Sequence, residues 1–161
     1  MNVDLRDQLK QKKQAYVQDE ILSSAATLFA EKGFRAITIT DIAARLGYTK
    51  SVVYYYFKNK NEILWQIFNR MYEKYQATID DILSQELSAD EALHRILHSH
   101  ALHVMKQKDW TAIYFRDESE LEPEQRLLSR KRKREYDAKI ELVYQRGIDE
   151  KKFKDVPPHI A

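Results

Sequence analysis

A short stretch near residue 50 combines aromatic hydroxyls with positive charge. The segment TKSVVYYYFKNK, residues 49–60, contains Tyr54, Tyr55 and Tyr56 in succession and lysines at positions 50, 58 and 60. Tyrosine hydroxyls are donors at the ends of stiff side chains, which suits phosphate oxygens at a fixed distance. An isolated run of tyrosines is more often buried core, but lysines surround this one. The stretch therefore favours contact with a nucleic-acid backbone.

Helical spacing divides this stretch into a buried and an exposed side. Val53 and Phe57 are four residues apart, so on a helix starting near Thr49 they share a face and are expected in the core. Tyr54 and Tyr55 then project to other faces, while position 56 lies nearer the buried side. The first residues of such a helix would enter the major groove and read base edges. These residues are Tyr48, Thr49, Lys50 and Ser51.

Catalytic and metal chemistry have less support. The sequence contains no Gly-rich phosphate loop, G-x-S-x-G or H-E-x-x-H motif, so no enzyme is predicted. In HRILHSHALH, His94 and His98 share one helical face, and His100 and His103 form a second pair on another. One helix leaves such a site without a third ligand. We predict no metal and no cofactor, with a helical metal-binding protein using His94 and His98 as a minor alternative.

Three predicted helices position the tyrosine stretch. QAYVQDEILSSAATLFAEKGF carries an apolar stripe at helical spacing and ends at Gly33. TITDIAARLG predicts a short second helix with Thr38 or Thr40 as its N-cap and Gly47 as its end. Only three residues separate Gly47 from the next helix. Two short helices joined by such a turn form a helix-turn-helix.

Longer helices are expected from residue 61 on. NEILWQIFNRMYEKYQATIDDILSQEL continues one apolar stripe, and Ser88 with Glu91 predicts a capping box at the start of the next helix. Pro123 suits the first position of a last helix, which Gly147 is expected to close. The predicted fold class is all-α. A three-helix DNA-binding domain at residues 1–60 is joined by a long helix to a second helical domain at 61–161.

Composition agrees with this division. Only three Gly and three Pro in 161 residues indicate a helix-rich chain. Residues 1–60 carry ten Lys and Arg against six Asp and Glu, whereas residues 61–161 carry seventeen against nineteen, so the basic excess lies in the first third. The chain has no Cys, no signal peptide and no apolar run near the roughly 18 residues of a membrane helix. We expect a cytoplasmic protein with no membrane partner.

The segment TITDIAARLGYTKSVVYYYFKNKNEIL resembles the N-terminal signature of TetR-type (TetR/AcrR) bacterial transcriptional regulators, and the match runs from about Ile21 to Leu64. The resemblance implies a homodimer that docks two recognition helices on double-stranded operator DNA, usually as a repressor. It also implies that residues 61–161 form a helical domain for effector binding and dimerisation. Ser51 departs from the family, which often has Gly or Ala there, so the bases read stay open. The predicted DNA-contacting residues are Thr40, Tyr48, Thr49, Lys50, Ser51, Tyr54, Tyr55 and Lys60.

The segment from Asp109 to Phe153 more loosely resembles effector domains of TetR-type regulators of fatty-acid, steroid or phenylacetate breakdown, several of which sense acyl-CoA thioesters. Apolar residues at 110–115 can line a pocket, and basic residues can meet the phosphates of a CoA. The run RKRKR, residues 130–134, is equally well explained as a solvated helix face. The predicted ligand contacts are Trp110, Tyr114, Phe115, Arg116, Arg130 and Arg134.

Two questions stay open at this stage. A ligand-independent architectural DNA binder is the main alternative to an effector-controlled regulator, because the second domain has no sharp motif. The final segment DVPPHIA is typical of a linker followed by the start of another helix. In the family two more helices normally follow and build most of the dimer interface. Either the last helices of the effector domain are missing from this chain, which we expect, or it dimerises by another surface.

Overall fold

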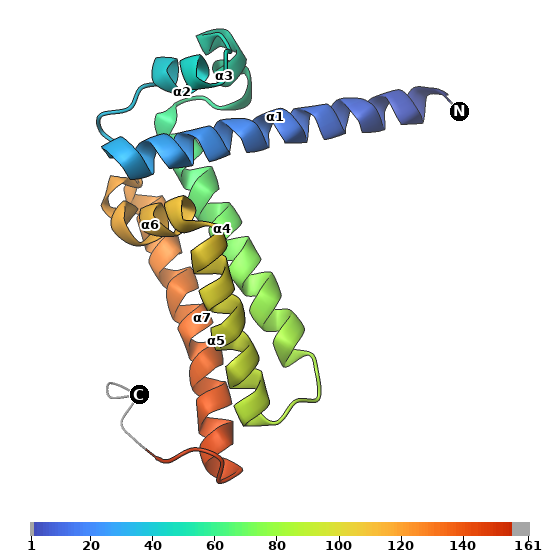
Figure 1. Cartoon of the computed structure of the whole chain (residues 1–161), viewed down its shortest axis with the longest axis vertical. Coiled ribbons are helices and arrows are strands. Elements are labelled where there is room, and N and C mark those ends of the chain that lie inside the picture. Colours follow the sequence, from blue (N-terminus) through green and yellow to red (C-terminus); the bar gives the residue numbers. More distant parts are fainter. Residues whose placement is uncertain (1, 156–161) are drawn as a thin grey trace. The chain divides into compact units, whose positions relative to one another are not determined.

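The computed structural model describes residues 2–155, and within that range all regular structure is helical (Figure 1). The all-α class expected from the sequence is confirmed. None of these helices is both long and apolar enough to cross a membrane. In chain order the elements are α1 (Asn2–Lys32), α2 (Ile39–Arg45), α3 (Lys50–Tyr56), α4 (Lys60–Leu83), α5 (Ala89–Lys106), α6 (Lys108–Arg116), the 3-10 turn η1 (Glu118–Glu120) and α7 (Pro123–Asp149).

The chain forms two compact units, and the first is discontinuous in sequence. One unit comprises Met1–Asn69 with Asp109–Glu122, and the other comprises Arg70–Lys108 with Pro123–Ala161. The first unit therefore contains α6 and η1 as well as the helix-turn-helix, and it is larger than the 1–60 segment drawn from the sequence. Helix α4 contributes to both units. The further helix expected in the final segment falls in Val156–Ala161, outside the described residues.

The first unit is built on the apolar face of α1. Ile21, Leu22, Ala25 and Phe29 follow helical spacing, and each is at most 1% exposed. The short helices cover this face with Ile42 and Ala43 of α2 and Val53 of α3, and α4 adds a third group. Members of the α4 group are Ile63, Leu64 and Ile67.

Local signals fix the ends of the short helices as expected. Gly33 and Gly47 have φ of +85° and +69°, the left-handed region in which glycine is unstrained. Thr38, rather than Thr40, is the N-cap of α2: its Oγ1 accepts from the Asp41 amide at 3.3 Å, and its own amide donates to Asp41 Oδ2 at 2.8 Å. The Thr38 hydroxyl bond lowers the pKa of the Asp41 carboxyl.

Two boundaries differ from expectation near the first unit. Helix α1 begins at Asn2, well before the predicted segment, because residues 5–13 are good helix formers although their side chains are exposed. A break at Gln107, with φ −129° and ψ 49°, separates α6 from α5. The sequence has neither Gly nor Pro at that break, so no local sequence signal predicts it.

In the second unit, two predicted helix-end features were wrong. Ser88 is the N-cap of α5, but its side chain makes no capping bond, and Glu150 Oε2 accepts from the next amide, Ala89 N, at 3.0 Å. Gly147 does not close α7, which continues to Asp149; Lys151 takes the left-handed conformation instead, with φ +56°. Gly147 is buried because the Phe153 ring occupies the space of a side chain there.

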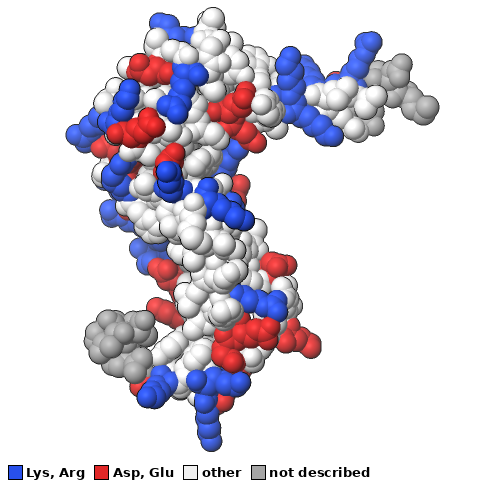
Figure 2. Space-filling view, in the orientation of Figure 1, with Lys and Arg blue, Asp and Glu red and all other residues white. Residues whose placement is uncertain are grey.

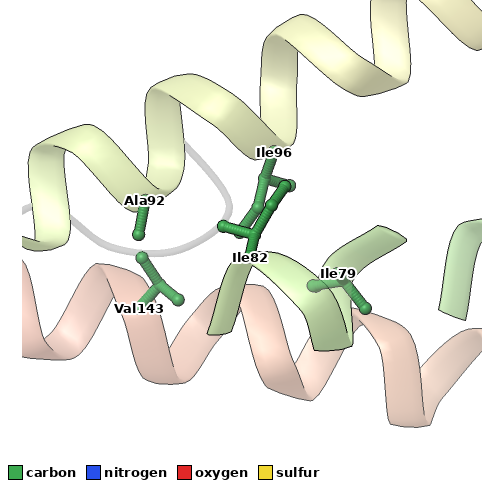
Figure 3. Packing of buried hydrophobic residues seen from close by; sticks show 5 residues of the cluster. All are labelled: Ile79, Ile82, Ala92, Ile96 and Val143. Atoms are coloured by element: carbon green, nitrogen blue, oxygen red, sulfur yellow. The ribbon is translucent and has the colours of Figure 1, made fainter. Parts of the chain in front are cut away.

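The core of the second unit joins three helices. Ile79 and Ile82 of α4 pack with Ala92 and Ile96 of α5 and with Val143 of α7 (Figure 3). Leu83, Leu87, Leu93, Tyr136 and Ile140 extend this cluster.

An aromatic group lies beside this core. The Tyr75 ring stacks on His100 at 5.1 Å between centroids and meets the edge of His103 at 5.4 Å. Burial raises the pKa of Tyr136 to about 12. Burial also lowers the pKa of His103, with smaller contributions from Lys74, His100 and Lys106. His103 Nδ1 is buried and has no hydrogen-bond partner in the described part of the chain.

We predict that His103 makes the fold sensitive to mild acid. The pKa of His103 is lower in the folded state than in the unfolded state, where it is near 6.5. The contribution of His103 to the free energy of unfolding is therefore fully present above pH 6.5 and is lost as the pH falls. The thermal midpoint, followed by circular dichroism at pH 7.5 and 5.5, should fall less for His103→Gln than for wild type. Exposed His98 supplies the control, His98→Gln, which should behave as wild type. Equal pH dependence in all three proteins would contradict the prediction.

We also predict that Gly147→Ala destabilises the second unit. The new Cβ would overlap the Phe153 ring, and displacing that ring costs about 1–3 kcal/mol. In a Phe153→Ala background the same change should stabilise by up to about 1 kcal/mol, because alanine favours the helix. Urea titrations of the four proteins test this reversal of sign, and a destabilising effect in both backgrounds would speak against it.

Candidate nucleic-acid interface

The turn between α2 and α3 presents the start of α3 to solvent. The Tyr48 amide donates to Ala43 O at 2.9 Å, which holds the turn against α2. The Tyr48 hydroxyl donates to Glu20 Oε2 of α1 at 2.8 Å, and this bond raises the pKa of Tyr48. Thr49 is the N-cap residue of α3, but its side chain makes no capping bond. The Thr49 hydroxyl is thus not used for capping. It lies at the end of α3 that is predicted to enter the major groove.

The predicted contact residues of α3 lie on its exposed side. Val53 and Phe57 are 0% and 4% exposed, whereas Tyr54 and Tyr55 are 53% and 68% exposed. Tyr56 is half-buried, as its position on the helix suggests. The division into a core face and an outer face is confirmed. Thr49, Lys50 and Ser51 are exposed beside them, as is Thr40 on the first turn of α2.

A contact with α1 orients one of the tyrosines. Gln14 Nε2 donates to the Tyr55 hydroxyl oxygen at 3.1 Å, and the Tyr55 ring meets the Tyr56 ring edge-on at 4.9 Å. A tyrosine that accepts in this way keeps its own O–H for a further acceptor, such as a phosphate oxygen. Sequence reasoning missed Gln14. The signal was its place three residues from Gln11 and four from Gln18, all on one helical face.

Lys60 differs from the other predicted contacts. Its Nζ donates to Phe34 O at 2.8 Å and to Ile37 O at 2.7 Å, and it lies 4.3 Å from the centroid of the Phe34 ring. Burial lowers the pKa of the ammonium group. In this arrangement Lys60 fastens the loop between α1 and α2, while neighbouring Lys58 is exposed.

Comparison with known proteins identifies the family. Residues 21–67 match the profile described as "Bacterial regulatory proteins, tetR family", and residues 86–161 match "Tetracyclin repressor-like, C-terminal domain". A transcriptional regulator of the TetR/AcrR family from Thermobifida fusca is 31% identical; the alignment covers 89% of this chain and 76% of that one, with a TM-score of 0.66. The chain belongs to the TetR family.

Curated TetR relatives match part of the chain. The fatty acid metabolism regulator protein of Bacillus subtilis is 28% identical over 92 residues, which are 57% of this chain and 46% of that protein. The HTH-type transcriptional repressor KstR2 of Mycolicibacterium smegmatis is 36% identical over 70 residues, 41% of this chain and 34% of that one. The chain thus spans less than half the length of these relatives.

In this TetR-family chain the predicted effector contacts are divided between the two units. Trp110, Tyr114, Phe115 and Arg116 belong to α6 in the first unit, whereas Arg130 and Arg134 belong to α7 in the second. Tyr114 is 8% exposed and packs on Phe68 of α4 at 5.1 Å between centroids, and Phe115 is 62% exposed. Trp110 is half-buried, and Arg130 and Arg134 are exposed. Their role toward a ligand stays a prediction.

Helix α6 is docked on the C-terminal end of α1. Arg116 Nη2 donates to Phe29 O at 2.8 Å, close to the last carbonyls of α1. Asp117, which accepts from Arg116 Nε at 2.8 Å, raises the pKa of the guanidinium. Thr27 Oγ1 donates to Asp109 Oδ2 at 3.0 Å, at the other end of α6. A cation near helix C-terminal carbonyls is favourable, so Arg116 acts as a cap for α1.

The two histidine pairs of α5 lie in different surroundings. His94 and His98 are exposed, with ring centroids 6.2 Å apart, while His100 and His103 contact Tyr75. Across residues 2–155, no group of three or more His, Asp or Glu is placed to hold a metal ion.

We predict that Lys60 stabilises the first unit. Lys60→Met removes the charged donor from two carbonyls, which should cost about 2 kcal/mol. Both tryptophans, Trp65 and Trp110, lie in this unit, so their fluorescence during urea unfolding reports its stability. Lys58→Met, at an exposed side chain, is the control and should change stability by less than about 0.5 kcal/mol. Equal midpoints for the two variants would contradict the assignment.

Proposed function

We propose that this protein is a sequence-specific DNA-binding transcriptional regulator of the cytoplasm, a repressor that a small-molecule effector releases from its operator. The observation that carries the proposal is the start of α3, where the side chains of Thr49, Lys50 and Ser51 are exposed to solvent. The names of the curated relatives, a metabolism regulator and a transcriptional repressor, support it. No enzymatic role is proposed.

The proposed contacts divide by chemistry. Short polar side chains and Lys50 at the start of α3 would reach base edges in the major groove, where each base pair has its own donor and acceptor pattern. Tyr54 and Tyr55 would donate to phosphate oxygens, which position the helix without reading sequence. Lys60 is already bonded to two carbonyls of the loop between α1 and α2. It would hold this loop in place rather than contact the DNA backbone itself.

Dimerisation follows from the geometry of helix-turn-helix recognition. A single seven-residue recognition helix reads few bases, and a two-fold dimer reads two half-sites whose centres are about 34–36 Å apart. Any change in the separation of the two recognition helices then weakens binding without altering a contact residue. We therefore propose a homodimer in which the effector changes that separation.

The effector signal would reach the helix-turn-helix through covalent connections. The chain passes between the two units within α4, after Lys108 and after Glu122, so both α4 and α6 lead from the second unit to the core around α1. An effector that prefers the state unable to bind DNA would weaken operator binding, and operator DNA would weaken effector binding by the same factor.

We propose an acyl-CoA thioester as the effector class. The fatty acid metabolism regulator of Bacillus subtilis supports this choice by its name. A structural neighbour of 22% identity, AibR, has been solved with isovaleryl coenzyme A and operator DNA. Calorimetry with fatty-acyl, aryl and steroid-derived CoA thioesters tests the class, with free CoA and metal ions as controls. Absence of binding to the folded protein across the panel would exclude the class.

We predict different effects for a base-reading and a phosphate-contacting residue. A duplex selected by wild type from a random library serves as the probe. Lys50→Ala should weaken binding to this duplex by about 1–3 kcal/mol and relax the preference for one base pair. Tyr54→Phe should weaken binding to all duplexes alike and leave their ranking unchanged. Failure of wild type to prefer any sequence would instead indicate an architectural DNA binder.

A further inference from the structure

The N-terminal part of α1 extends beyond the core of its unit. Side chains from residue 5 to residue 13 are exposed, and continuous burial begins only near Ile21. Leu5, Leu9 and Tyr16 form a sparse apolar line, but Lys12 occupies the position that would continue it, so this surface does not suit a partner helix. We call residues 5–18 the α1 extension.

Next to α3, the α1 extension forms a polar groove. Gln11, Gln14 and Gln18 are spaced by three and four residues and so share a face. With Ala15, Tyr55 and Tyr56 they line a groove of about 380 Å³. The Gln14 bond to the Tyr55 hydroxyl ties the two walls together. Amide side chains carry two N–H donors each, so the groove suits an acceptor-rich ligand.

The charge around this groove is positive. The α1 extension, residues 5–18, contains Arg6, Lys10, Lys12 and Lys13 against one carboxylate, Asp7. Blue Lys and Arg side chains stand out along this part of the chain in Figure 2. By helical spacing Lys10 lies beside the glutamine face, and Lys12 and Lys13 lie farther round the helix, one on each side of that face. This positive charge favours a polyanion over a neutral or basic partner.

We infer that the α1 extension binds the sugar-phosphate backbone of duplex DNA outside the bases that α3 reads. The inference rests on the proposed function, and it adds a second contact region to the predicted contacts of α2, α3 and the turn between them. The groove shares Tyr55 with the predicted phosphate contacts of α3, so one strand of duplex can run from α3 onto the extension. The glutamines donate to phosphate oxygens and the lysines neutralise them.

The length of the helix sets the reach of this contact. Leu5 lies nine residues before Gln14, and at 1.5 Å per residue this part of the α1 extension spans about 14 Å. Duplex DNA rises 3.4 Å per base pair, so the part of the extension from Leu5 to Gln14 covers about four base pairs of flanking backbone. These contacts carry no base information and act on affinity and salt dependence.

The test uses a triple variant, Lys10→Gln, Lys12→Gln and Lys13→Gln, which keeps good helix formers. Its control removes the same charge from the second unit at exposed side chains, through Lys106→Gln, Lys151→Gln and Lys154→Gln. The probe is the duplex selected by wild type from a random library, both at full length and with four flanking base pairs trimmed from each end.

For wild type and the control, trimming should weaken binding, whereas the triple variant should bind both duplexes alike. Each phosphate contact adds about 0.9 to the slope of log K against log salt, so the triple variant should have a slope shallower by about 1–3 per chain. Its ranking of competitor duplexes should stay that of wild type.

A triple variant that matches the control in slope and in response to trimming overturns the inference and leaves the proposed function standing. If wild type prefers no duplex sequence, the proposed function fails. If it binds no duplex at all, both fail.

Discussion

The packing of the two short helices α2 and α3 on the core around α1 is the interaction on which the DNA-binding part of this protein depends. Helices α2 and α3 have seven residues each, and helices of that length are unstable in water on their own. They persist because Ile42 and Val53 are fully buried in the core that Leu22 and Phe29 of α1 help to form. The orientation of the recognition helix is therefore a property of α1.

Helix α1 also makes hydrogen bonds to other elements at two places along its length. Near its N-terminal part, Glu20 accepts from Tyr48 and Gln14 donates to Tyr55. At its C-terminal end, Arg116 of α6 binds the Phe29 carbonyl. Single hydrogen bonds of this kind contribute only about 1 kcal/mol of net stability, but their direction adds an orientation that apolar packing does not specify by itself. In this unit, α1 connects α6 to the turn that precedes α3.

Local signals made much of the first unit predictable. Gly33, Gly47 and the Thr38 cap each act through backbone geometry within a few residues, so the sequence contains the whole cause. The outer positions of Tyr54 and Tyr55 followed from the spacing of Val53 and Phe57. The bond of Lys60 to carbonyls 23 and 26 residues away did not, because it depends on how the loop folds back.

Tertiary contacts decided the features that sequence reasoning missed. Gly147 has the residue type of a helix end, yet it sits inside α7 because the Phe153 ring needs its space, and Lys151 takes the left-handed position instead. Helix α6 follows α5 after a break without Gly or Pro, and its tertiary contacts, the bonds to α1 and the packing of Tyr114 on Phe68, show that it belongs to the first unit. Because Arg116 and Asp109 fix both ends of α6 to α1, a displacement of α6 transmits force to α1 rather than being absorbed in a loop. Since α2 and α3 depend on α1 for their orientation, a displacement of α6 would move the recognition helix together with the whole first unit.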